Sequence, residues 1–173
     1  LFRGPVKTRS GYGAHARDIL WALREMGTYD IKIDSCGWGS TPMNALDPEN
    51  AKHKAILDCL LTEPKLETQP EIFVQITVPN EFQRLGKFNI GITAGIETTV
   101  APKEWVDGCN VMDLVITTSN FSRDVLIQTV YNENEKNTGK LIRQHRIEKP
   151  IKVLFEGVDT KIYNNKPDGE FGL

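Results

Sequence analysis

The sequence contains few cysteines and histidines, and neither residue type forms a cluster. Its 173 residues include three cysteines, Cys36, Cys59 and Cys109, and three histidines. The cysteines form no C-x-x-C pair and are odd in number, which excludes a disulfide framework of the secreted type. The scattered histidines show no metal-ligand spacing. We therefore expect free thiols and no metal site.

Long apolar runs and an excess of one charge are also lacking. No run approaches the roughly 20 apolar residues that a membrane span needs, and no secretory leader is recognisable. The 21 basic and 23 acidic side chains nearly balance, so charge gives no indication of a nucleic-acid partner. These features predict one cytoplasmic domain over residues 1–173, without a transmembrane segment.

What the sequence does contain is an alternation of strand-like and helix-like segments. Runs rich in β-branched and aromatic residues predict strands over 29–35, 71–78, 88–93, 114–117 and 151–155. Apolar spacing and capping residues predict a helix that ends at Gly27, and helices that begin at Asp47-Pro48, at Pro102 and at Ser119 or Asn120. The alternation predicts an α/β, Rossmann-like three-layer domain with a mostly parallel sheet.

One segment departs from this alternation. Residues 132–149 are polar and charged, and we interpret them as a long insertion. Within it, residues 140–146 are basic. We expect a solvated helix there, with an anion-binding face as the alternative.

Ligands of parallel sheets bind beyond the carboxyl ends of the strands. The segments that follow predicted strands are therefore candidates for a site. The candidate loops are residues 4–13, 36–41, 79–82, 94–100, 119–122 and 156–160.

The loop over residues 4–13 carries the strongest local signal. It is rich in small residues and opens a helix, so its free N–H groups and the helix dipole suit a phosphate or another anion. Gly11 and Gly13 would let the backbone turn sharply and approach a ligand. The alternative is an ordinary strand-to-helix turn.

The same glycines also fit a dinucleotide fingerprint. Gly11-x-Gly13-x-x-Ala16 matches G-x-G-x-x-A, and Asp30 or Asp34 follows at the distance of a ribose-binding acid. A strand should come directly before the first glycine of that fingerprint, whereas the polar residues 7–10 stand there.

Four segments together resemble a known family. Residues 10–17 read S-G-Y-G-x-H-x-R, residues 95–98 read G-I-E-T, and residues 119–122 read S-N-F-S. Residues 155–159, F-E-G-V-D, followed by Tyr163, resemble the signature N-G-V-D-x-x-x-F with Glu for Asn and Tyr for Phe. In this order they resemble the N-terminal domain of GT-B glycosyltransferases, above all the retaining family 4.

The resemblance implies two Rossmann-like domains with an active site between them. The N-terminal domain holds the acceptor and places a glycine loop near the donor's phosphates. The second domain carries most of the nucleotide-sugar site, including an E-x(7)-E motif, and no such motif follows Asp159. We therefore expect this chain to be the acceptor-side half, lacking the donor domain and inactive by itself.

The resemblance also suggests binding residues. Gly11, Tyr12 and Gly13 would lie near the donor phosphates or the acceptor. Arg17 would grip a phosphate through its guanidinium fork, or else be an ordinary exposed residue of the first turns. Ser119 would contact sugar, or else cap a helix.

Glu97 is the candidate catalytic residue, because relatives place a His or Asp near this position. Its alternative role is that of a loop carboxylate bonded to backbone N–H groups. Trp38 and Trp105 could stack on an acceptor sugar, and for Trp105 we favour packing in the core. The expected ligands are a nucleotide-sugar donor and a glycan or other hydroxyl acceptor, with no further cofactor. Two other functions stay open: an NAD- or FAD-binding domain, and a non-catalytic domain that binds a glycan or a partner.

Overall fold

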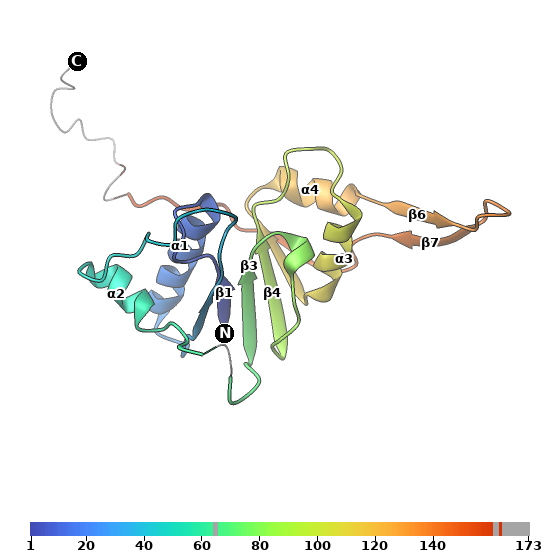
Figure 1. Cartoon of the computed structure of the whole chain (residues 1–173). Coiled ribbons are helices and arrows are strands. Elements are labelled where there is room, and N and C mark those ends of the chain that lie inside the picture. Colours follow the sequence, from blue (N-terminus) through green and yellow to red (C-terminus); the bar gives the residue numbers. More distant parts are fainter. Residues whose placement is uncertain (64–65, 161–162, 164–173) are drawn as a thin grey trace, which may run out of the picture.

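The computed structural model describes residues 1–63, 66–160 and 163, and its centre is a six-stranded sheet. The strand order is β2-β1-β3-β4-β5-β8, and every pairing is parallel (Figure 1). The strands are β1 (Phe2–Gly4), β2 (Ile33–Ser35), β3 (Ile72–Ile76), β4 (Phe88–Thr93), β5 (Leu114–Thr117) and β8 (Ile151–Val153).

Helices cover both faces of this sheet. They are α1 (Gly11–Met26), α2 (Ala51–Leu57), the short 3-10 helix η1 (Pro79–Glu81), α3 (Lys103–Val111) and α4 (Asn120–Gln128). One apolar cluster joins α1 and α2 to the sheet, and a second joins α3, α4 and Phe82, which directly follows η1, to it. The predicted α/β, Rossmann-like three-layer architecture is therefore confirmed.

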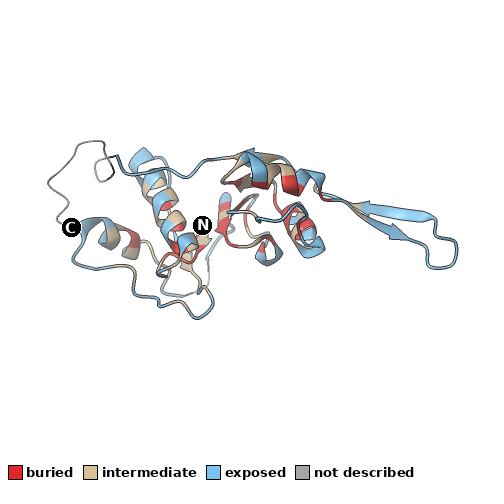
Figure 2. Ribbon diagram, turned by 90° about the horizontal axis from the view of Figure 1, so that it is seen from above, coloured by how far each residue is buried: buried red, intermediate tan, exposed pale blue. Residues whose placement is uncertain are grey.

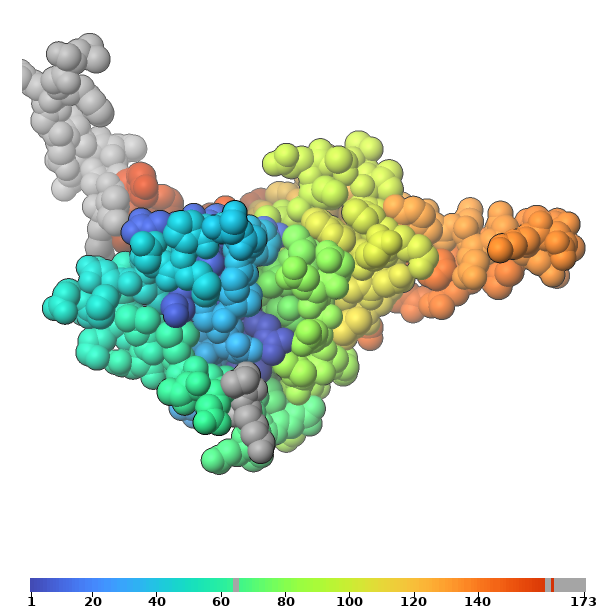
Figure 3. Space-filling view, in the orientation of Figure 1, coloured from blue at the N-terminus to red at the C-terminus, as the bar shows by residue number. Residues whose placement is uncertain are grey.

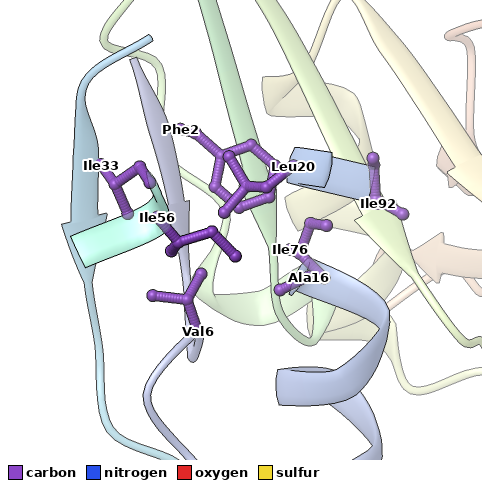
Figure 4. Packing of buried hydrophobic residues seen from close by; sticks show 8 residues of the cluster. All are labelled: Phe2, Val6, Ala16, Leu20, Ile33, Ile56, Ile76 and Ile92. Carbon is purple, nitrogen blue, oxygen red and sulfur yellow. The ribbon is translucent and has the colours of Figure 1, made fainter. Parts of the chain in front are cut away.

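The first cluster fixes α1 against the centre of the sheet. Phe2, Ile76 and Ile92 come from three strands and meet Ala16 and Leu20 of α1 (Figure 4). All of these side chains are almost fully buried. Because α1 begins directly after the loop that follows β1, this packing also holds the start of the helix at the carboxyl edge of the sheet.

The second cluster depends on a close approach between α3 and η1. A Cβ on Gly108 would lie 1.9 Å from the carbonyl oxygen of Pro79, so only glycine fits there. Trp105 on α3 is partly buried against the same cluster. The expectation that Trp105 packs in the core is confirmed.

Helix α1 has a capping residue at each end, of which Gly27 was predicted. The Ser10 hydroxyl accepts a hydrogen bond from the N–H of Gly13 at 3.0 Å, as an N-cap does. Gly27 ends the helix in the left-handed region, at φ 64°.

Several boundaries differ from the sequence prediction. Helix α2 begins at Ala51 instead of Pro48, because Asn50 caps it by accepting hydrogen bonds from the N–H groups of both Lys52 and His53. Strand β1 had no predicted bounds, although the loop over residues 4–13 was expected to follow a strand. β2 is shorter than expected, and α3 continues past Gly108 to Val111.

The predicted helix over residues 140–146 is wrong. Residues Tyr131–Asn134 (β6) and Leu141–His145 (β7) form an antiparallel hairpin that projects from the domain as an exposed arm (Figures 1 and 2). Cross-strand contacts favour this pairing: Glu133 lies opposite Arg143, and its carboxylate is 3.0 Å from His145 Nε2. Gly139, at φ 68°, lies in the connecting turn.

Candidate functional site

The strand order places a switch point between β1 and β3. From β1 the chain continues to β2 on one side, and β3 then pairs with the other side. The loops that follow β1 and β3 therefore run to opposite sides of this point. Parallel α/β sheets bind ligands at the carboxyl edge beside such a switch point. The candidate site comprises residues 5–13, 36–46 and 93–98 with the start of α4.

Arg17 braces the loop that follows β1. Its Nη1 donates to the carbonyl oxygens of Val6 and Thr8, both at 2.9 Å. Burial lowers the pKa of this guanidinium. The Thr8 hydroxyl donates to Pro5 O at 2.8 Å and tightens the same turn. Arg17 thus holds the loop in shape, and its Nη1 is committed to the protein's own carbonyl groups.

Gly13 and Gly11 serve different purposes. A Cβ on Gly13 would lie 2.5 Å from Thr8 O, whereas a Cβ on Gly11 would meet nothing within 4 Å. Neither glycine has a positive φ, so the expected sharp turn is not the reason for them. Gly13 allows the helix to pack on the loop. The N–H groups of Gly11 and Tyr12 make no hydrogen bond within the described chain and point to the open end of the helix.

Tyr12 connects three segments of the edge. Its hydroxyl lies 3.0 Å from Thr93 Oγ1 at the end of β4 and accepts a hydrogen bond from the N–H of Ala94 at 3.1 Å. Its ring stacks on Trp38, with ring centroids 4.2 Å apart and an interplanar angle of 22°. Tyr12 therefore joins the start of α1 to the loops after β2 and β4.

The loop after β4 is anchored to the start of α4. The hydroxyls of Thr118 and Ser122 both donate to Ala94 O, at 3.2 and 3.1 Å. Gly95 has φ 87°, and a Cβ on it would lie 2.4 Å from Ser122. Glycine is therefore required for this contact, which sets the direction of the loop (yellow-green in Figure 3).

Glu97 lies on that loop and is exposed. Within the described chain its carboxylate makes no hydrogen bond or ion pair, including none with the backbone N–H groups of the alternative interpretation. The base of the loop is held firmly, while the Glu97 carboxylate stays free to contact a ligand.

Ser119 caps α4. Its hydroxyl accepts from the N–H of Ser122 at 3.0 Å and donates to Ser122 Oγ at 3.0 Å. Of the two roles predicted for Ser119, contact with sugar or capping of a helix, the structure shows the cap.

The segment after β8 lies beside the start of α1. His15 Nδ1 is 3.2 Å from a carboxylate oxygen of Glu156, and His15 Nε2 is buried with no hydrogen-bond partner in the described chain. Sequence reasoning assigned no role to His15 or Thr93. The signal for His15 was present, because it follows Tyr12 by three residues and so shares its side of the helix.

The structure bears on the dinucleotide alternative in two places. Residues 5–10 separate the end of β1 from Gly11, so the glycines do not form the turn directly after the strand. Of the two candidate ribose-binding acids, Asp34 accepts a hydrogen bond from Arg3 Nε at 2.7 Å through Oδ2, while Asp30 is exposed.

Other observations describe the chain as a whole. All three cysteines are free, and burial raises the pKa of Cys36 and that of Cys109, the latter to about 12. Among the described residues, no three potential ligand side chains gather to hold a metal ion. No helix in the described ranges is long and apolar enough to cross a bilayer. The chain matches no protein-family model, no curated protein and no solved structure.

Proposed function

We propose that this chain is the acceptor-side domain of a GT-B glycosyltransferase, which transfers a sugar from a nucleotide-sugar donor to a hydroxyl acceptor. In this proposal the loop over residues 5–13 faces the donor's diphosphate, and Glu97 faces the reacting centre. A second domain supplies most of the donor site, so residues 1–173 alone do not transfer sugar.

One observation carries the proposal: the four segments that resemble the family are joined to one another at the carboxyl edge. Tyr12 of the first segment is bonded to Thr93 and Ala94, directly before the second. Gly95 of the second contacts Ser122 of the third, and Glu156 of the fourth pairs with His15 of the first. Segments that are far apart in the sequence thus form one continuous surface.

The charges near the start of α1 also suit a diphosphate. The free N–H groups of Gly11 and Tyr12 and the dipole of a 16-residue helix favour an anion there. Arg9 lies in the same loop, where Asn44 holds its guanidinium through two hydrogen bonds of 2.8 and 3.3 Å. A single helix end and one nearby cation should bind a nucleoside diphosphate with about millimolar affinity, or roughly 4 kcal/mol.

For localisation, we propose the cytoplasm. All three cysteines are free, as is usual where thiols are kept reduced.

The test is an NMR titration of the ¹⁵N-labelled chain with UDP-glucose, GDP-mannose and NAD. We expect a sugar nucleotide to shift the amide signals of Gly11, Tyr12 and Ala94. A shift with NAD alone would favour the dinucleotide alternative. No shift at these residues with any of the three would favour a non-catalytic binding domain.

A pair of variants sharpens the test. Gly11→Glu places a negative charge at the first residue of α1, where the side chain has open space. It should leave the fold stable, because acids are favourable at a helix start, and should weaken nucleotide binding about tenfold. The control, Ala51→Glu, adds the same negative charge at the first residue of α2 and should leave nucleotide binding unchanged.

A further inference from the structure

The stacked rings of Tyr12 and Trp38 lie at the carboxyl edge without belonging fully to the core. Both side chains are half-buried, so part of their aromatic surface remains accessible. Tyr12 packs against the first apolar cluster, whereas Trp38 belongs to neither cluster that the described residues form. An indole held outside the core needs a reason other than packing.

Hydrogen bonds hold the Tyr12 ring and the backbone of the loop that carries Trp38. Both the Thr93 hydroxyl and the N–H of Ala94 bond the Tyr12 hydroxyl, so the phenol cannot turn freely. The loop that carries Trp38 is tied to β1 by a hydrogen bond of 3.1 Å from the N–H of Cys36 to Gly4 O. It is closed by one of 3.0 Å from the N–H of Thr41 to Trp38 O. A rigid aromatic surface loses little entropy when a ligand binds.

The loop that carries Trp38 has no charged side chain of its own, although the Arg9 guanidinium is hydrogen-bonded to its Asn44. Residues 36–46 contain no Asp, Glu, Lys or Arg. Within the described chain, the hydroxyls of Ser40 and Thr41 make no hydrogen bond. Free hydroxyls beside an aromatic surface suit a neutral ligand that has an apolar face and several hydroxyl groups of its own.

From these observations we propose that the Trp38 indole, backed by the stacked ring of Tyr12, forms a platform for the pyranose ring of the acceptor. This inference rests on the proposed function and names the acceptor class as a glycan. The C–H groups on one face of a pyranose carry partial positive charge, and the face of an indole is electron-rich. Ser40 and Thr41 would bond the ring hydroxyls. A nucleobase could also stack on indole, and Arg9, which Asn44 of this loop holds, could contact the phosphate that accompanies it, so the experiment tests nucleotides beside the sugars.

The experiment follows the indole N–H signals of the ¹⁵N-labelled chain. The sequence has three tryptophans, so Trp21 and Trp105 serve as internal controls. The probes are the methyl pyranosides of glucose, mannose and galactose, and separately uridine and adenosine monophosphates. We expect at least one pyranoside to shift the Trp38 indole signal and the Ala94 amide, with both control indoles unmoved.

Variants then separate stacking from folding. Trp38→Ala should weaken pyranoside binding at least tenfold, and Trp38→Phe should restore part of it because an aromatic face remains. Trp21→Phe, on the α1 side that faces Lys52 of α2, should change nothing. A melting curve for each variant shows whether the fold is retained. If Trp38→Ala does not fold, the pyranoside affinity of Trp38→Phe tests the platform instead.

Three outcomes overturn the platform: no pyranoside shifts the Trp38 signal, only a nucleotide does, or Trp38→Ala folds and binds normally. The proposed function is judged separately by the nucleotide shifts at Gly11 and Tyr12. Pyranoside binding at Trp38 without any nucleotide binding would keep the platform and overturn the transferase. Nucleotide binding at Gly11 without pyranoside binding would support the transferase and overturn the platform.

Discussion

Asn89 and Asp113 join two neighbouring strands at the end of the sheet opposite the candidate site. The backbone N–H and the side-chain Nδ2 of Asn89 both donate to Asp113 Oδ2, at 2.8 and 2.9 Å. Asn89 Oδ1 also accepts from the N–H groups of Leu85 and Gly86, at 3.0 and 2.8 Å. The fully buried Asn89 thus uses its whole side chain to fix the turn before β4 to the start of β5.

Asn89→Ala should lower the free energy of unfolding by about 3 kcal/mol, because buried N–H groups and a carboxylate lose their partners. Urea denaturation followed by circular dichroism measures this value. The matched control is Asn137→Ala in the exposed turn of the arm, which should change stability by less than about 0.5 kcal/mol. Equal stability of the two variants would contradict the role assigned to Asn89.

Asp113 should make the stability of the fold sensitive to acid. Hydrogen bonds from Asn89 and Arg84 lower the pKa of its carboxyl group to about 2, against about 3.9 in an unfolded chain. Because the folded pKa is the lower one, this stabilisation is present above about pH 5 and is lost as the pH falls toward 2. Denaturation at several pH values should show a shallower acid slope for Asp113→Asn. Asp58→Asn, at an exposed carboxylate, should keep the wild-type slope.

The two glycines at the start of α1 should respond differently to the same substitution. Gly13→Ala forces a methyl group against Thr8 O and should cost about 1–3 kcal/mol of stability. Gly11→Ala enters open space and should be neutral or slightly stabilising. Thermal unfolding of the two variants tests this expectation. An unchanged melting temperature for Gly13→Ala would show that the loop over residues 5–10 shifts to accommodate the methyl group at little energetic cost.

The three thiols should react at different rates. Cys109 is fully buried and its pKa is raised to about 12, so the reactive thiolate is rare. Cys36 and Cys59 are both half-buried; burial raises the pKa of Cys36, and the Cys59 sulfur accepts a hydrogen bond from Arg24 of α1. Labelling with a thiol reagent, followed by mass spectrometry, should modify Cys109 at least about 10²-fold more slowly than Cys59 until the protein is unfolded. Comparable native rates would mean that the α3 region opens readily.

Glu97 should matter for transfer and not for folding. In the complete transferase that we propose, Glu97→Gln removes the charge but keeps the size, and turnover should fall about 10²-fold or more. The exposed Glu104→Gln on α3 is the control. Near-normal turnover for Glu97→Gln would exclude a role at the reacting centre, and its melting curve would reveal any loss through unfolding.

Interactions within a few residues were readable from the sequence. The Gly27 terminus and the apolar spacing of α1 act over one or two helical turns, and both are as predicted. The β-branched run over residues 114–117 likewise predicted strand β5. Local patterns were therefore sufficient to predict the α/β class.

Contacts between distant segments were decided by the tertiary structure. The pairing of β6 with β7 overrode the helical expectation for residues 140–146, because cross-strand partners across a turn are invisible to local spacing. Arg17 was predicted to grip a phosphate or to be an ordinary exposed residue, and local spacing did not show that its Nη1 would bond the carbonyl groups of Val6 and Thr8. The stacking of Tyr12 on Trp38 likewise depends on β1 and β2 being neighbours, which brings the loops after them together at the carboxyl edge.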